Sequence, residues 1–270
     1  MDPRPERMFR PEAVLRAGAA IFALIAAGLV ALLVTAHLEA VDPRTLPAVR
    51  PPKASAPTPA PSPLTDLGRG DLGSVVTIQV EVELSNEESL GTGWIFDSKG
   101  DIVTNAHVIS GHVAIRVTDR SDRTEVAVVL GSDATNDIAL LRPEGAFPGQ
   151  ELPVDAAAFV KVPASVIALA SSTATGRGDM TAETLIGLHA NVPLAPNGGV
   201  DQGQVGPQIY NDMLHLEGER IYEGNSGGPV LDAAGQVVGI LTLASPSSPD
   251  AYAIPISRVL AELIQWSKSG

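Results

Sequence analysis

The sequence of 270 residues contains no cysteine. Disulfide bonds, thiolate metal sites and a cysteine nucleophile are therefore excluded. Basic residues are also few, with 18 Lys and Arg against 31 Asp and Glu and a formal net charge of −13. Because a protein this acidic repels a phosphate backbone, we expect no binding of nucleic acid. Apolar residues still make up 44% of the chain, which is enough for a buried core.

A long uncharged segment lies near the N-terminus, over residues 17–38. About twenty apolar residues in a helix span roughly 30 Å, the thickness of a bilayer's hydrocarbon core. Four arginines precede it, which predicts that residues 1–16 lie in the cytoplasm. We expect a single-pass membrane anchor that leaves the rest of the chain outside the cytoplasm, in the periplasm or at the cell exterior. The alternative is a signal peptide, after whose cleavage the protein is secreted.

Residues 39–64 are rich in proline, with eight prolines between Pro43 and Pro63. Such a composition predicts an extended, semi-rigid linker. The remaining residues, 65–270, form the predicted folded domain.

Short β-rich runs separated by turn residues dominate this domain, and they predict an all-β fold built of antiparallel barrels or sandwiches. The predicted strands are Val75–Val82, Gly93–Phe96, Asp101–Asn105, Val113–Val117, Val126–Leu130, Ile138–Leu141, Ser165–Ala170, Glu183–Asn191, Ile209–Leu216, Pro229–Leu231, Gln236–Leu243 and Tyr252–Ile254. One amphipathic helix is predicted at the C-terminus, with Ser257 as its N-cap. Residues 193–207 have few apolar side chains and predict a surface loop.

Three segments carry candidate chemistry. His107 lies at the end of a predicted strand in Thr104-Asn105-Ala106-His107-Val108, and Asp137 lies at the head of an apolar strand. Each of these residues, taken alone, also fits a purely structural role, as a core histidine or a turn aspartate. Ser226 lies in Gly224-Asn225-Ser226-Gly227-Gly228, where glycines allow consecutive N–H groups to converge beside an exposed hydroxyl. A plain glycine-rich hairpin is the alternative for that segment.

The order His107, Asp137, Ser226 supplies a base, an acid that orients the base, and a nucleophile. In this order and in its motifs the chain resembles the chymotrypsin-like serine peptidases, and most closely their HtrA/Deg branch. The segments that carry the resemblance are Gly91–Phe96, Thr104–Val108, Asn136–Leu141, Gly224–Pro229 and Tyr252–Pro255. The resemblance covers about residues 70–265. Only fifteen residues follow Pro255, so the PDZ domain usual in this branch is not expected.

The resemblance implies two perpendicular six-stranded β-barrels, over about residues 70–150 and 155–256. It also implies that Ser226 is the nucleophile, His107 the general base and Asp137 its orienter. The oxyanion hole would lie at Gly224, Asn225 and Ser226, mainly through the N–H groups of the first and last. Where digestive members carry an aspartate before the nucleophile this chain has Asn225, so activation by a trimmed N-terminus is not expected. Ordering of residues 193–207 on substrate binding is the alternative.

The predicted specificity pocket lies just before the nucleophile. Arg220 aligns with the position that is acidic in trypsin-like members, so cleavage after Lys or Arg is not expected. Ile221 favours a small aliphatic residue at the cleavage site, whereas an Arg220 that faces the pocket would favour an acidic one. The strand of Ile240, Leu241, Thr242 and Leu243 should pair with the substrate backbone.

Together with the predicted anchor, the resemblance therefore predicts a membrane-tethered serine endopeptidase that hydrolyses exported or misfolded proteins through an acyl-enzyme. The alternative is a catalytically silent module of the same fold that only binds peptides. No cofactor is expected, and the histidines outside the three segments show no spacing typical of a metal site. The sequence leaves open whether the protein is a monomer or a trimer.

Overall fold

The computed structural model describes residues 63–82, 88–145, 147, 149–154, 161–176, 179–193 and 209–270. The predicted anchor, 17–38, and all of the predicted loop 193–207 except Pro193 lie outside these residues. Within the described part of the chain, no helix combines the length and apolar character needed to cross a bilayer.

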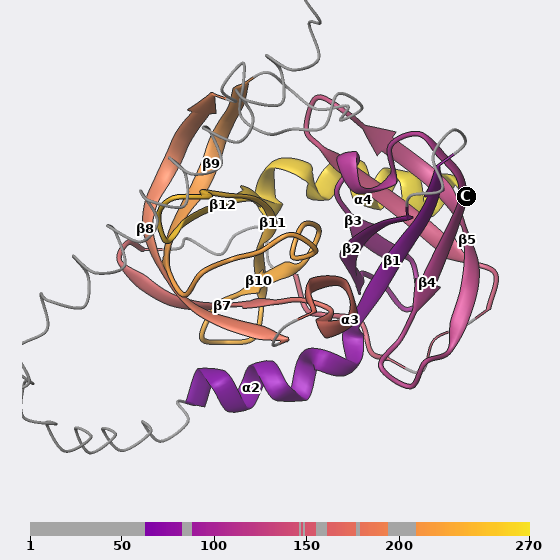
Figure 1. Cartoon of the computed structure of the whole chain (residues 1–270), viewed down its shortest axis with the longest axis horizontal. Coiled ribbons are helices and arrows are strands. Elements are labelled where there is room, and N and C mark those ends of the chain that lie inside the picture. The colour runs from indigo at the N-terminus through magenta and orange to yellow at the C-terminus, as the bar shows by residue number, and fades with distance from the viewer. Residues whose placement is uncertain are drawn as a thin grey trace, which may run out of the picture. The chain divides into compact units, whose positions relative to one another are not determined.

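The first six strands form a closed antiparallel barrel, which we call barrel 1 (Figure 1). Its strands are connected in the order β1-β2-β3-β6-β5-β4. Alternate residues face inward, so that Ile78, Val80 and Val117 are fully buried. The strands are β1 (Val75–Val82), β2 (Glu88–Ile95), β3 (Ile102–Thr104), β4 (His112–Thr118), β5 (Thr124–Asp133) and β6 (Ile138–Pro143).

The remaining strands form a second closed antiparallel barrel, barrel 2, in the order β10-β11-β12-β9-β8-β7. These strands are β7 (Ala164–Leu169), β8 (Met180–Pro193), β9 (Ile209–Gly218), β10 (Pro229–Leu231), β11 (Val237–Ala244) and β12 (Asp250–Pro255). Each of the twelve predicted strands is found, and their ends lie within three residues of the predicted bounds except at β2, which begins five residues earlier, at Glu88. The expected pair of six-stranded antiparallel barrels with a C-terminal helix is thereby confirmed.

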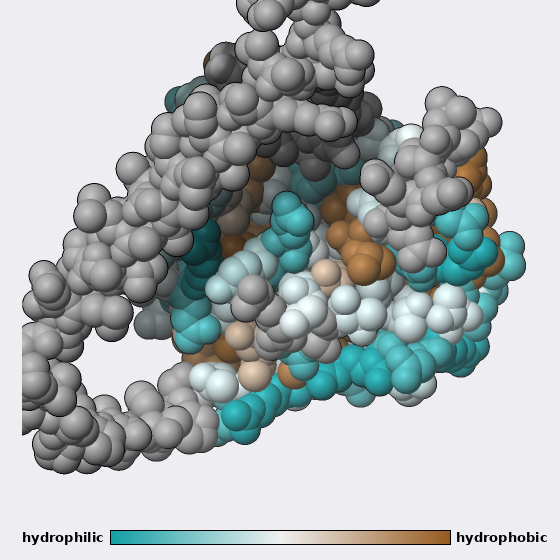
Figure 2. Space-filling model, in the orientation of Figure 1, coloured by the Kyte–Doolittle hydropathy of each residue, from teal (hydrophilic) through white to brown (hydrophobic). Residues whose placement is uncertain are grey.

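One hydrophobic cluster joins the two barrels. It contains Trp94, Ile138 and Leu140 of barrel 1 together with Met213 and Ile240 of barrel 2. Each barrel also has its own apolar cluster. On the face of the molecule that is shown in Figure 2, the hydrophobic residues among those described lie in separate groups between hydrophilic ones.

The C-terminal helix α4 (Ile256–Ser269) leaves β12 and contacts strands of both barrels. Its N-cap is Pro255, and no side chain caps the helix, so the predicted capping role of Ser257 is wrong. Ser257 follows the first helical residue and is exposed. Of the predicted apolar face, Val259 and Leu263 are fully buried and Leu260 is partly buried, whereas Ile264 is 37% exposed, so the prediction is wrong for Ile264.

Two short helices and two 3-10 turns complete the described elements: α2 (Pro63–Asp71), α3 (Ser172–Thr175), η1 (Leu72–Ser74) and η2 (His107–Ile109). Helix α2 packs against barrel 2, where Gly68 approaches the Ile167 and Met180 side chains (Figure 1). The sequence does not predict α2, which begins at Pro63, within the last residues of the predicted linker.

Candidate active site

His107 and Asp137 form a tightly bonded pair. His107 opens the 3-10 turn after β3, and Asp137 immediately precedes β6, a neighbour of β3 in the sheet. The ring Nδ1 of His107 lies 2.7 Å from Asp137 Oδ2, and the His107 backbone N–H donates to Oδ1 at 2.9 Å. Because a carboxylate can only accept, Nδ1 carries the ring proton and Nε2 is left as the basic atom of the neutral ring.

The backbone at Asp137 is in the left-handed region, with φ of 56°. Asparagine and aspartate tolerate this region better than most residues, so the position suits the residue type. The Asp137 carbonyl oxygen accepts a hydrogen bond of 2.8 Å from Asn105 Nδ2. The carboxylate is fully buried, and its orientation is therefore set by its donors rather than by water.

Ser226 lies in a tight turn between β9 and β10 that only glycines allow at two positions. Gly224 and Gly227 both have φ of 87°. A Cβ on Gly227 would lie 2.1 Å from the Thr92 carbonyl oxygen, so this turn must approach barrel 1 very closely. The Thr92 N–H donates to the Ser226 carbonyl at 2.9 Å and holds the turn against β2.

The Ser226 hydroxyl donates to the Thr242 carbonyl at 3.4 Å. Thr242 Oγ1 in turn accepts from Asn105 Nδ2 at 3.1 Å, and the same amide group donates to the backbone carbonyl of Asp137. The structure thus brings the three predicted segments together around Thr242 and Asn105. No hydrogen bond joins Ser226 and His107 in the part of the chain that the structure describes.

The turn also presents backbone donors beside the hydroxyl. The Gly224 and Ser226 N–H groups donate to no described residue. The Gly224 carbonyl accepts from Thr92 Oγ1 at 2.6 Å, which holds the peptide plane in place. Asn225 differs, because its N–H already donates to the Tyr222 carbonyl at 3.2 Å. Its side-chain oxygen accepts from the Tyr222 N–H. Asn225 therefore stabilises the turn, and its backbone N–H is not free to donate to an oxyanion.

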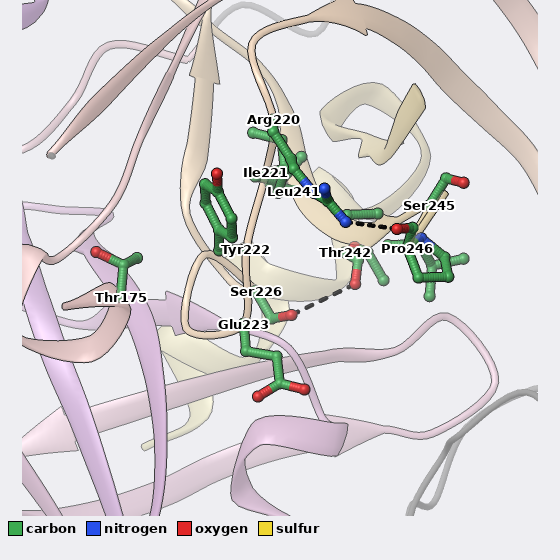
Figure 3. Close-up of a pocket in the computed structure, with 12 residues that line it drawn as sticks. Thr175, Arg220, Ile221, Tyr222, Glu223, Ser226, Leu241, Thr242, Ser245 and Pro246 are labelled. Carbon is green, nitrogen blue, oxygen red and sulfur yellow. Dashed lines mark hydrogen bonds between the residues drawn. The ribbon is translucent and has the colours of Figure 1, made fainter. Parts of the chain in front are cut away.

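A pocket of about 500 Å³ opens next to Ser226 (Figure 3). Of the predicted substrate-binding residues, Arg220, Ile221, Leu241, Thr242 and Leu243 line it. Ile240 does not line it, because its side chain is fully buried in the cluster between the barrels. The pocket wall also contains Ala244, at the end of the strand that is predicted to pair with substrate, and four residues that the sequence does not single out: Thr175, Tyr222, Ser245 and Pro246.

The Arg220 side chain lies across this pocket. Its guanidinium donates to the Pro246 carbonyl, and its Cζ lies 6.0 Å from the Tyr222 ring centroid (Figure 3). Glu223 also lines the pocket, and it is exposed, as are Glu217 and Glu219. The Arg220 guanidinium and the acidic side chains therefore face solvent, while Ile221 and Leu241 supply the buried apolar wall of the pocket.

Besides these pocket residues, the sequence misses two residues that hold the candidate catalytic groups in place. Tyr210 donates its hydroxyl to Asp137 Oδ2 at 2.9 Å, and Thr92 holds Gly224. Thr92 lies in Gly91–Phe96, whose resemblance to the family could have pointed to it. Tyr210 carries no local motif, and its contact spans 73 positions of the chain.

Comparison with known proteins finds serine proteases. Residues 91–240 match the family described as a trypsin-like peptidase domain. Protease Do-like 1 of the chloroplast of Arabidopsis thaliana is 32% identical over 188 residues, which cover 66% of this chain and 40% of that protein. The serine endoprotease DegS of Escherichia coli is 27% identical over 187 residues, which cover 66% of this chain and 49% of DegS.

Solved structures share the architecture. The active form of the Rv3671c protease from M. tuberculosis matches with a TM-score of 0.62 and 23% identity, over 80% of this chain and 93% of that one. This likeness concerns the fold alone. The chain spans 40–49% of the length of the two curated relatives named above. Because the family match covers more than half of the sequence, the chain belongs to the trypsin-like peptidases, and to their HtrA type.

Proposed function

We propose that this protein is a serine endopeptidase in which Ser226 is the nucleophile, His107 the general base and Asp137 its orienter. The observation that carries the proposal is the 2.7 Å bond between His107 Nδ1 and Asp137 Oδ2. It leaves Nε2 as the acceptor for the Ser226 proton, after a rotation of the serine side chain away from the Thr242 carbonyl. Such hydrogen bonds are often unmade in the absence of substrate.

The reaction would proceed in two stages. Ser226 Oγ attacks the peptide carbonyl while His107 Nε2 takes the hydroxyl proton, and the same proton then goes to the leaving amine. Water, deprotonated by His107, hydrolyses the acyl-enzyme and frees Ser226. The Gly224 and Ser226 N–H groups stabilise the oxyanion in both stages, and each such donor contributes about 3–4 kcal/mol to lowering the barrier.

Replacement of the nucleophile tests this function. We expect Ser226→Ala to reduce hydrolysis of an unfolded protein substrate at least about a thousandfold, since the covalent route is lost. The thermal unfolding midpoint should change little, because only a hydroxyl in a long hydrogen bond is removed. Ser269→Ala, at the exposed end of α4, is the matched control and should retain full activity. Undiminished hydrolysis by purified Ser226→Ala protein would contradict the proposal.

The alternative of a silent peptide-binding module has one observation in its favour. The Ser226 hydroxyl is bonded to the Thr242 carbonyl rather than to His107. If this arrangement persisted with substrate bound, peptides would bind without being cleaved. Tight binding of a peptide to the wild-type chain with no product over hours would identify that module.

We further propose that the pocket takes a small aliphatic side chain. Ile221 and Leu241 form its apolar wall, and the bond from Arg220 to the Pro246 carbonyl holds the guanidinium across the pocket, on its solvent side. An acidic side chain would instead draw the guanidinium away from Pro246. Profiling of a peptide library separates these alternatives. If the pocket takes an aliphatic side chain, Arg220→Ala should extend the preference to larger aliphatic residues. If it takes an acidic side chain, the same substitution should abolish the preference.

For the substrates and the location, the proposal rests on the sequence. Residues 17–38 would anchor the domain outside the cytoplasm, where exported or misfolded polypeptides are the substrates. The strand β11 suits them, because pairing with substrate backbone is tolerant of sequence. We expect the full chain to resist extraction from membranes by alkaline carbonate. Complete release of the full chain would favour the secreted form.

A further inference from the structure

The Asp137 carboxylate receives a third hydrogen bond, and this bond comes from the other barrel. Its Oδ1 accepts from the His107 backbone, and its Oδ2 accepts from both His107 Nδ1 and the Tyr210 hydroxyl, at 2.7 and 2.9 Å. His107 and Asp137 belong to barrel 1, whereas Tyr210 lies at the start of β9 in barrel 2. The carboxylate is thus shared between the barrels.

Tyr210 is held firmly in this position. Its ring is buried in the hydrophobic cluster that joins the barrels, and its backbone pairs with Val192 of β8. The next residue, Asn211, accepts a hydrogen bond at its carbonyl from Arg258 of α4. Because Tyr210 has so little freedom to move, its hydroxyl favours one orientation of the Asp137 carboxylate.

The hydroxyl also keeps its proton. Burial, and then the nearby Asp137 charge and the hydrogen bond to it, raise the pKa of the Tyr210 phenol well above its ordinary value. Tyr210 is therefore a donor at any pH at which a serine peptidase works. Among the described residues, the titratable groups bonded to the Asp137 carboxylate are His107 and Tyr210.

We infer that Tyr210 is a positioning residue, which holds the Asp137 carboxylate against His107 and withdraws part of its charge. The inference rests on the proposed function, because it gives the His107–Asp137 pair a catalytic role. A hydrogen bond to a carboxylate stabilises its charge, so its loss makes the carboxylate a stronger partner for the protonated imidazole. The loss also frees the carboxylate to rotate away from the geometry that holds the ring tautomer.

The variant Tyr210→Phe tests this role, because it keeps the buried ring and removes only the hydroxyl. We expect kcat to fall about tenfold with KM changed less than twofold, since Tyr210 is buried and does not line the pocket. The acid limb of kcat/KM should move up by about half a pH unit, because the imidazole holds its proton more strongly. Tyr252→Phe is the matched control, because Tyr252 stacks on His215 and should leave both quantities unchanged.

A second measurement does not depend on catalysis. The His107 imidazole can be titrated by NMR in full chains that carry Ser226→Ala, with and without Tyr210→Phe. A midpoint that moves to higher pH with Tyr210→Phe supports the inference, even if the wild-type chain hydrolyses nothing and the proposed function fails. An unmoved midpoint would overturn the inference. So would a loss of kcat that is accompanied by lower thermal stability and an unchanged pH profile.

Discussion

Glu183 is a carboxyl group buried in barrel 2 without a hydrogen-bond partner among the described residues. It is 4% exposed, and neither of its side-chain oxygens is bonded. It faces Gly218 across β8 and β9, where a Cβ would lie 2.7 Å from Glu183 Oε2. Burial, with a smaller contribution from the nearby Glu219 charge, raises the pKa of Glu183 from 4.5 to about 8.

This residue predicts a loss of stability as the pH rises. The folded state holds the Glu183 proton up to about pH 8, whereas the unfolded chain releases it near pH 4.5. The stabilising contribution is therefore complete below pH 4.5, declines above it and is lost above about pH 8. At about 1.4 kcal/mol for each pKa unit, the free energy of unfolding should fall by a few kcal/mol.

Urea denaturation of the wild-type chain and Glu183→Gln, at pH 5 and at pH 9, measures this effect. Glutamine does not ionise, so we expect the difference between the two pH values to be smaller in Glu183→Gln. The exposed Glu217 offers a matched control in Glu217→Gln, which should behave as the wild-type chain does. An equal pH dependence in all three proteins would contradict the account of Glu183.

At the residue scale, the sequence predicts the functional residues that lie in local motifs. It misses residues whose role depends on a contact with a distant part of the chain. His107, Asp137 and Ser226 each lie in a short segment whose residue types fit their chemistry. Tyr210 lies in a strand whose alternation indicates only burial, and its role depends on the docking of two barrels. The prediction that Ile240 binds substrate is wrong for its side chain. Side chains alternate in direction along β11, and that of Ile240 points into the core between the barrels.

At the scale of single elements, helix α4 connects the barrels. It contacts β11 and β12 of barrel 2 and β5 and β6 of barrel 1. Trp266 packs against Gly131 of β5, where a Cβ would lie 2.1 Å from the indole ring. Near the helix C-terminus, the Ser267 carbonyl accepts from Lys99 and the Ser267 hydroxyl donates to Asp97 at 2.5 Å. The helix is therefore bonded to barrel 1 at the end opposite to β12.

Two adjacent residues of α4 allow a matched test of this connection. Leu263 is fully buried in the cluster between the barrels, whereas Ile264 is 37% exposed. We expect Leu263→Ala to reduce the free energy of unfolding by about 2–5 kcal/mol, because it leaves a cavity. Ile264→Ala should change it by less than about 1 kcal/mol. Equal and small effects in urea denaturation would show that α4 does not stabilise the joined barrels.

The twelve strands could be predicted because alternating apolar residues and turn signals mark them locally. Helix α2 could not, since its two interior glycines, Gly68 and Gly70, weaken any helical pattern, and its first residue, Pro63, belongs to the proline-rich run. Its formation depends on packing against barrel 2, where Gly68 permits the close approach. Ser257 fails as a cap because the strand β12 runs directly into the helix, so that Pro255 takes the capping position.

At the scale of the whole molecule, the site exists only where the two barrels meet. Barrel 1 supplies His107 and Asp137, and the turn that carries Ser226 belongs to barrel 2. Bonds from Thr92 to the Ser226 turn and from Tyr210 to Asp137 cross between the barrels in both directions. Motif order alone indicates that these segments belong to one site, but the resting bond from Ser226 to Thr242 depends on the folded arrangement.

The proposed activity requires that the Ser226 hydroxyl leave Thr242 and be activated by His107. Treatment of the full chain in non-ionic detergent with a fluorophosphonate, followed by peptide mass spectrometry, tests it most directly. We expect phosphonylation of Ser226 in the wild-type protein, none at that position in Ser226→Ala, and far slower labelling of Ser226 in His107→Ala. Folded wild-type protein whose Ser226 remains unmodified, or is labelled equally fast without His107, would contradict it.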